Sequence, residues 1–131
     1  YEDGTWSPTI DSSVAGTGRA TTITNATYTK IGNCVIATCY LTLTTLGTGG
    51  SGSLAVKGLP YAPAGYQPAL CGYASGLNAT LYTVSGYTSS GATQIILTGS
   101  ASLSVSPLAE LGFTTYAKAA MQIMVSVTYQ V

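Results

Sequence analysis

Between Tyr28 and Leu46, apolar and polar side chains alternate over a stretch long enough to restrict strongly what this chain can fold into. One set of alternate positions is apolar and consists of Val35, Ala37, Cys39, Leu41 and Leu43. The other set is rich in threonine and includes Thr38, Thr42 and Thr44. A period of two is typical of a β-strand with one face on a core, and a tight turn at residues 31–33 precedes it.

The second face of this predicted strand is not fully polar, because it also carries Ile36 and Tyr40. A strand face in contact with water more usually carries Lys, Glu or Gln. We therefore expect something to cover this face in part, such as another subunit.

The rest of the chain predicts further short strands separated by turn signals. We expect them at residues 4–10, 21–29, 53–58, 69–75, 79–85, 93–98, 101–105 and 119–131. Loops are expected at 11–20, 59–68 and 85–92, with hairpin loops at 46–52 and around 76–78. A single helical turn is expected at 107–113. This pattern predicts one domain over residues 1–131, an antiparallel β-sandwich or jelly roll of about eight strands.

Charge is scarce: charged residues make up 6% of the chain, hydrophobic residues 46%, and the formal net charge is zero. A folded monomer of this size would have an accessible surface on the order of 6,000 Å², and so few charged residues can cover only a small part of it. This favours an oligomer, in which part of the surface is buried. The few cations form no basic cluster, which argues against nucleic-acid binding. No apolar run reaches the roughly 18 residues that a membrane span needs.

The residue types needed for most chemistry are sparse. Histidine is absent, and the four acids are Glu2, Asp3, Asp11 and Glu110. Asp11 and Glu110 are the one pair that could meet as the two carboxylates of a glycosidase, but lone charged loop residues are usually just solvated. We therefore expect no catalytic residues, no metal and no cofactor. Three cysteines, Cys34, Cys39 and Cys71, predict free thiols, because Cys34 and Cys39 lie five residues apart on one strand and face opposite sides.

Tyrosine is abundant, with ten copies in 131 residues. An aromatic ring offers a flat apolar face and a hydroxyl, a combination that suits sugars as well as protein partners. For any one tyrosine, capping the end of the fold is the simpler explanation. As a group with polar neighbours in and beside loops, they predict a binding surface made of Tyr61, Tyr66, Gln67, Tyr73, Asn78, Tyr82, Tyr87, Ser89, Ser90 and Tyr116.

Four segments occur in a recognisable order. They are Gly4-Thr5-Trp6-Ser7-Pro8-Thr9, Tyr28-Thr29-Lys30-Ile31-Gly32-Asn33, the Gly/Ser-rich stretch 43–52, and Val56-Lys57-Gly58-Leu59-Pro60-Tyr61. This order, with a terminal strand that ends in Tyr129, resembles the C-terminal head domain of tailed-bacteriophage tail fibres and tailspikes. Residues 66–118 match this pattern weakly, and the cysteines are not part of it.

The resemblance implies a homotrimeric β-sandwich knob at the fibre tip of a virion, made in the host cytoplasm. It implies attachment to a bacterial surface polysaccharide or lipopolysaccharide, without membrane insertion. It also implies that the chain is the C-terminal piece of a longer protein, with any depolymerase activity upstream. Two alternatives are a structural cap that trimerises the fibre without touching receptor, and an enzyme such as a glycan esterase or hydrolase.

Overall fold

A computed structural model describes residues 1–102 and 108–131. In these residues the chain forms ten strands and one short helix. The strands are β1 Glu2–Thr5, β2 Thr9–Val14, β3 Ala20–Ile31, β4 Cys34–Thr45, β5 Ser51–Lys57, β6 Gln67–Ser75, β7 Thr83–Ser89, β8 Ala92–Ser100, β9 Ala109–Glu110 and β10 Gln122–Gln130; the helix is α1 Phe113–Tyr116.

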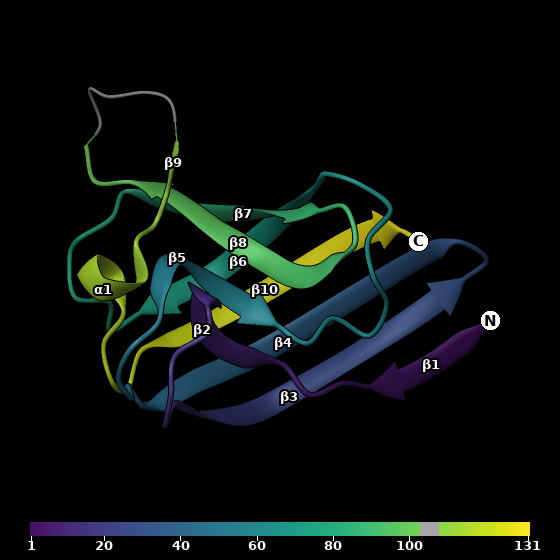
Figure 1. Ribbon diagram of the computed structural model, residues 1–131. Coiled ribbons are helices and arrows are strands. Elements are labelled where there is room, and N and C mark those ends of the chain that lie inside the picture. Colours follow the sequence, from purple (N-terminus) through teal and green to yellow (C-terminus); the bar gives the residue numbers. More distant parts are fainter. Residues whose placement is uncertain (103–107) are drawn as a thin grey trace.

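All strand pairs are antiparallel and belong to one sheet in the order β1-β3-β4-β10-β6-β7-β8-β5-β2, with β9 added to β8. The sheet curls into a half-barrel around one apolar core (Figure 1). This confirms the predicted all-β antiparallel class, with ten strands where the sequence predicted about eight. A single chain shows neither jelly-roll connectivity nor a trimer.

The two strands with the clearest alternation lie side by side. β10 pairs with β4 from Gln122–Thr42 to Gln130–Cys34, although the two strands are far apart in sequence. The predicted apolar face of β4 is buried as expected. On β10 the buried face consists of Ile123, Val125, Val127 and Tyr129.

The predicted strand at residues 4–10 is wrong in its continuity, because the structure divides it into β1 and β2. Trp6 and Pro8 lie between them and are both buried. The Trp6 indole Nε1 donates to the Thr27 and Thr38 carbonyl oxygens at 3.2 and 3.1 Å. The chain thus leaves one edge of the sheet at Trp6 and rejoins the sheet at its other edge. The expected loop at 11–20 is correspondingly shorter, because β2 continues to Val14.

The predicted hairpin loop at 46–52 is also wrong. β5 pairs with β2 and β8, not with β4, so this segment crosses between distant strands. Its backbone pairs instead with the loop after β2, through Thr17 and Thr48. Glycine-rich composition predicted a turn correctly but could not say which strands the turn connects.

Tyr87 lies in β7 and not in the predicted loop at 85–92, where only residues 90–91 separate β7 from β8. Tyr87 is opposite Pro68 on one side and Ile96 on the other. The predicted hairpin between 69–75 and 79–85 is confirmed as β6–β7, but its connection is longer because β7 starts at Thr83. The Ser, Gly and Thr residues around Tyr87 are typical of a loop, and this segment is a strand because it pairs with β6 and β8.

The helical turn is displaced from its predicted place. It forms at 113–116, whereas Ala109 and Glu110, inside the predicted helix, form β9. Of the strand expected at 101–105, residues 101 and 102 are not in a strand, and 103–105 lie outside the described residues, as does Pro107.

The Arg19 guanidinium holds three segments together at one end of the sheet. Its Nε donates to Asp11 Oδ1 at 2.6 Å, and its other nitrogens donate to the Leu46 and Gly49 carbonyl oxygens. The guanidinium also lies 3.9 Å from the centre of the Phe113 ring. Only 7% of the Arg19 side chain is exposed, so this is a nearly buried and well-satisfied charge. We call this group the Arg19 clamp.

The three cysteines are free thiols in the structure. Cys39 is buried on the core face of β4, and this burial raises the pKa of its thiol to about 12. Cys71 is half-buried on β6, and burial raises its thiol pKa as well. Both thiols are therefore protonated and poorly nucleophilic at neutral pH.

Candidate functional site

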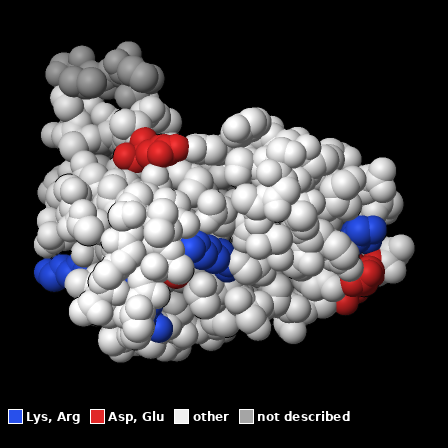
Figure 2. Space-filling model, viewed as in Figure 1, with Lys and Arg blue, Asp and Glu red and all other residues white. Residues whose placement is uncertain are grey.

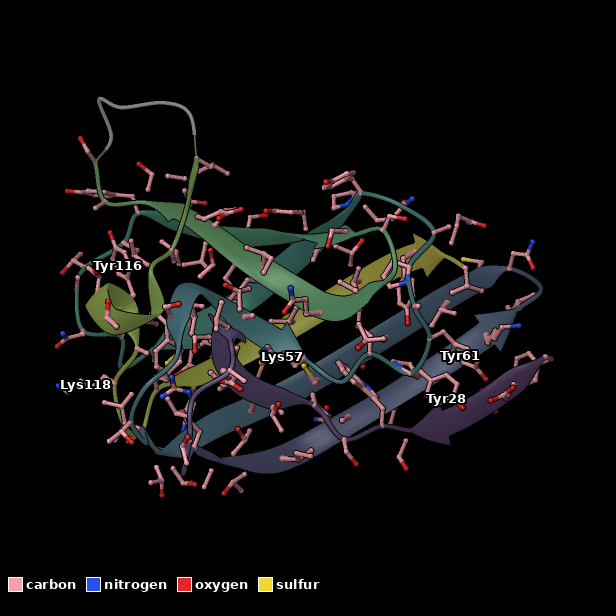
Figure 3. All side chains as sticks on the ribbon, viewed as in Figure 1. Tyr28, Lys57, Tyr61, Tyr116 and Lys118 are labelled. Atoms are coloured by element: carbon pink, nitrogen blue, oxygen red, sulfur yellow. The ribbon has the colours of Figure 1, made fainter. Side chains whose placement is uncertain are left out.

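The predicted binding residues separate into two groups at opposite ends of the β6–β7 hairpin. The register pairs Gln67 with Thr88 at one end and runs toward the 76–82 connection at the other. The first group comprises Tyr61, Tyr66, Gln67, Tyr87, Ser89 and Ser90. The second comprises Tyr73, Asn78, Tyr82 and Tyr116. Figure 3 shows this separation for Tyr61 and Tyr116, which lie at opposite ends of the molecule.

At the first end, the connection between β5 and β6 packs against the β7–β8 turn. Gly91 N donates to the Pro63 carbonyl oxygen at 2.9 Å, and Ser90 Oγ donates to that of Ala64 at 3.3 Å. The buried Thr88 hydroxyl donates to the Gly65 carbonyl oxygen and accepts from Gln67 N. The two segments predicted as loops at 59–68 and 85–92 therefore meet in space.

An exposed aromatic pair lies where these segments meet. Tyr66 is 77% exposed, and its ring centre is 6.2 Å from that of Tyr87, with 34° between the ring planes. Tyr87 donates its hydroxyl to Glu110, whose other carboxylate oxygen accepts from Ser53 Oγ at 2.8 Å. We call these four residues the Tyr66–Tyr87 platform. They come from the connection just before β6 and from β7, β9 and β5.

The electrostatics of the platform follow from these hydrogen bonds. The Tyr87 hydroxyl, and then Ser53, lower the pKa of the Glu110 carboxyl below its ordinary value. The same carboxylate raises the pKa of Tyr87 to about 12. At neutral pH, Glu110 is therefore a carboxylate and Tyr87 a neutral hydrogen-bond donor. Each holds the other in place on the side of the sheet away from the core, which we call the outer face.

Of the three polar residues predicted beside these rings, only Ser90 uses its side chain in the framework of the described residues. Ser90 Oγ is engaged with the Ala64 carbonyl, and Gln67 uses its backbone N–H to contact Thr88. Ser89 is half-buried at the end of β7. The side chains of Gln67 and Ser89 make no hydrogen bond in the described structure, so both amide and hydroxyl are available for a ligand.

Tyr61 belongs to a different contact. Its hydroxyl donates to Glu2 at 2.7 Å, and the Tyr28 hydroxyl donates to the same Glu2 oxygen at 2.5 Å. The Tyr61 and Tyr28 rings meet edge to face at 5.9 Å, and Tyr61 N donates to the Tyr129 hydroxyl. Bonds from Tyr28 first, and then Tyr61, lower the pKa of Glu2. Tyr61 thus ties β1, β3 and β10 together.

The second group lies around the far end of the hairpin. Asn78 N donates to the Tyr116 carbonyl oxygen at 3.0 Å, which attaches the 76–82 connection to α1. The Tyr82 ring is 57% exposed, while Tyr82 N donates to the Ser100 carbonyl oxygen. Tyr73 lies in β6, not beside a loop, and its ring meets that of Tyr40 edge to face at 6.3 Å.

Ser53 is not among the predicted site residues, and Glu110 is considered in the sequence only as a possible partner of Asp11. Because the chain has only four acids, each carboxylate is a candidate functional group. The hydrogen-bond partners of Glu110, however, lie 23 and 57 residues away in the sequence. Asp11 and Glu110 do not bond to each other. Asp11 instead forms ion pairs with Arg19 and, at 3.7 Å, with Lys57.

Charged side chains on the face seen in Figure 2 are few, and they occur singly or in small groups with wide uncharged areas between them. Within residues 1–102 and 108–131, no three His, Cys, Asp or Glu side chains lie close enough to hold a metal ion. No helix in the same residues is long and apolar enough to cross a membrane. Comparison of the chain with protein-family models, curated proteins and solved structures finds no match.

Proposed function

We propose that this chain is the receptor-binding head of a bacteriophage tail fibre or tailspike, located at the fibre tip of the virion, and that it attaches to a glycan on the bacterial surface. The proposal joins two independent supports. The first is the resemblance carried by the ordered segments around Trp6, Tyr28, Tyr61 and Tyr129. The second is the Tyr66–Tyr87 platform, which has the groups that sugar recognition needs.

The observation that carries the proposal is the exposed Tyr66 ring beside a Tyr87 ring fixed by Glu110. A sugar presents apolar C–H faces, which stack on aromatic rings, and hydroxyls, which donate to carboxylates. β7, β8 and β5 supply a rigid base, so little ordering is needed when a ligand binds. Glu110 would repel an anionic glycan, and this favours a neutral polysaccharide or the neutral part of a lipopolysaccharide.

An array of neutral bacterial surface glycans tests the proposal with the purified domain. Tyr66→Ala and Tyr87→Ala should each weaken binding by about 1–3 kcal/mol if the rings are anchors. Raising the salt concentration should change the affinity little, because no ion pair contributes to it.

Tyr1→Ala is the matched control, because Tyr1 is also exposed but lies in neither predicted group. It should leave binding unchanged. An array that gives no signal, or a signal that survives the loss of both Tyr66 and Tyr87 in a folded protein, contradicts the proposal.

The alternative is a structural cap that trimerises the fibre without contacting receptor, and a specific observation supports this alternative. The outer face of β4, β10 and β6 carries a cluster of apolar and aromatic side chains among its threonines and serines: Met124 lies opposite Tyr40 on one neighbour and Tyr73 on the other. Beside them runs a groove of about 230 Å³ whose nine lining residues include no charged one. We propose that three chains associate through this face, each contributing one curled, sandwich-like sheet to the knob.

A further inference from the structure

The β6–β7 hairpin opens before it ends. Its register stops at Leu70–Ser85, although β6 continues to Ser75 and β7 begins at Thr83. The space between the two strands forms a groove of about 190 Å³. Eight residues line this groove: Cys71, Gly72, Tyr73, Ala74, Leu81, Tyr82, Thr83 and Val84. We call this the hairpin groove.

The walls of the hairpin groove are held from outside it. β6 is paired with β10 along this stretch, and β7 is paired with β8 through Thr83–Ser100 and Val84–Gly99. The 76–82 connection is attached to α1 through Asn78. The groove is therefore formed before any ligand arrives, which lowers the ordering cost of binding.

The chemistry of the lining resembles that of the Tyr66–Tyr87 platform. None of its eight residues is charged, and two tyrosine rings, 43% and 57% exposed, belong to it. Gly72 leaves space there, since no atom other than those of its two chain neighbours lies within 4 Å of where its Cβ would be. Exposed rings beside backbone and hydroxyl polar groups fit a neutral sugar better than a charged peptide.

The hairpin groove and the platform belong to the same hairpin: Tyr82 directly precedes β7, and Tyr73 of the groove lies on the outer face that also carries Tyr87. Tyr87 and Tyr82 are five residues apart, which corresponds to about 16 Å of extended chain. A single sugar cannot reach both, whereas a polymer that runs along β7 can.

We propose that the hairpin groove is a second subsite for the same neutral glycan, so that the head binds an extended oligosaccharide along β6–β7 rather than one terminal sugar. This inference rests on the proposed function, because the platform supplies the first subsite. Two subsites on one chain of ligand act as linked modules, and each adds to the affinity only when the ligand spans both.

The test uses the neutral array glycan with the strongest Tyr66-dependent signal, prepared as disaccharide and octasaccharide fragments. The octasaccharide should bind about tenfold or more tightly than the disaccharide to the unaltered protein. Tyr82→Ala should remove most of this gain and leave the disaccharide affinity unchanged. Tyr82→Phe, which keeps the ring, should retain it. Tyr82 is preferred to Tyr73, because Tyr73 contacts Tyr40 on the face through which we propose that chains associate.

A second readout follows backbone amides by NMR. The octasaccharide should shift the Gly72 and Thr83 signals, and the disaccharide should not. Equal affinity of both fragments, or groove amides that do not shift, overturns the second subsite while Tyr66-dependent binding upholds the proposed function. If the groove amides shift when only the protein concentration is raised, the groove is a contact with a neighbouring chain, and the second subsite is overturned as well. An array without any signal overturns both proposals together.

Discussion

Arg19 is the side chain on which most of one end of the fold depends. It donates to a carboxylate, a serine hydroxyl and two carbonyl oxygens, and it covers the Phe113 ring. In the sequence it is one of four isolated cations, a setting in which a charge is usually only solvated. The structure shows instead that its burial is matched by a partner for each nitrogen, so its removal leaves the partly buried Asp11 carboxylate and the buried Ser12 hydroxyl without this donor.

Arg19→Ala should lower the free energy of unfolding by about 3 kcal/mol, because it removes one partner of a nearly buried ion pair. Arg19→Lys should recover only part of this, since an ammonium cannot reproduce the guanidinium fork. Urea unfolding followed by Trp6 fluorescence measures the effect, as Trp6 is the single, buried tryptophan. Lys118→Ala, at an exposed site, should stay within about 0.5 kcal/mol of the unaltered protein. If Arg19→Ala proves as stable as Lys118→Ala, the Arg19 clamp does not stabilise the fold.

Asp11, the partner of Arg19, predicts a dependence of stability on pH. Burial alone would raise the pKa of the Asp11 carboxyl, but hydrogen bonds from Arg19, Gly16 N and Ser12 N outweigh it and the pKa is lowered. The folded pKa lies below the unfolded value of about 3.9, so the stabilisation is fully present above that value. It is lost as the pH falls through the folded pKa.

Asp11→Asn should therefore be less stable than the unaltered protein at pH 7, and this difference should shrink as the pH falls from about 5 to 2. Urea midpoints of the two proteins across this range measure it. If the difference between the two urea midpoints stays constant across this pH range, the Asp11 carboxyl has the same pKa in the folded and unfolded states. Because Glu2 and Glu110 also have lowered pKa values, the unaltered protein should keep some acid sensitivity of other origin.

Among the strands and their connections, the 46–50 segment shows most clearly that tertiary contacts determine which strands a glycine-rich turn connects. It passes from β4 to β5 across the end of the sheet and is held there by Thr17 and Arg19. Two of its glycines have the same backbone conformation, with φ of 71° at Gly47 and 69° at Gly49, but differ in their surroundings.

Gly49→Ala should cost about 1 kcal/mol, the penalty of a left-handed backbone at a non-glycine residue. Gly47→Ala should cost clearly more, because its Cβ would lie 2.4 Å from the Thr17 carbonyl oxygen. Thermal unfolding of both variants separates backbone conformation from contact, since nothing lies within 4 Å of a Cβ at Gly49. Equal losses would contradict the close approach of the two loops.

For the molecule as a whole, the outer face of β4, β10 and β6 is the feature most at odds with an isolated chain. Leu70 is 66% exposed there, and the same face carries the exposed Ile36 and Met124 and the Tyr40–Tyr73 ring pair. Exposed apolar side chains that share one face favour contact with another protein surface. On the proposed function, that surface belongs to two further copies of this chain.

We expect a homotrimer by light scattering of the purified domain at micromolar concentration. Tyr40→Lys and Met124→Lys should weaken it, because an ammonium would be desolvated without a partner. Ala119→Lys adds the same charge at an exposed site outside this face and should leave the mass unchanged. A monomer from the unaltered chain would contradict the assembly, and with it the structural-cap alternative.

The segments behind the family resemblance proved to be parts of the framework. Trp6 donates to β3 and β4, and Tyr61 N donates to the hydroxyl of Tyr129. In this chain, these residues connect β1, β3, β4 and β10. Of the candidate site, the sequence predicted Tyr66 and Tyr87 but neither their proximity nor the Ser53–Glu110 support, since a hydrogen bond between distant strands leaves no local pattern.

Strand identity in β4 and β10 could be read from the chain because a buried face imposes a period of two on neighbouring residues. That information is local, and so are the turn at 32–33 and the all-β class. Which strands pair, where Tyr87 belongs and how Arg19 is used were decided only by tertiary structure. Contacts such as β10 against β4, or Glu110 against Tyr87, join residues far apart in sequence, and their energies depend on the whole curled sheet being present.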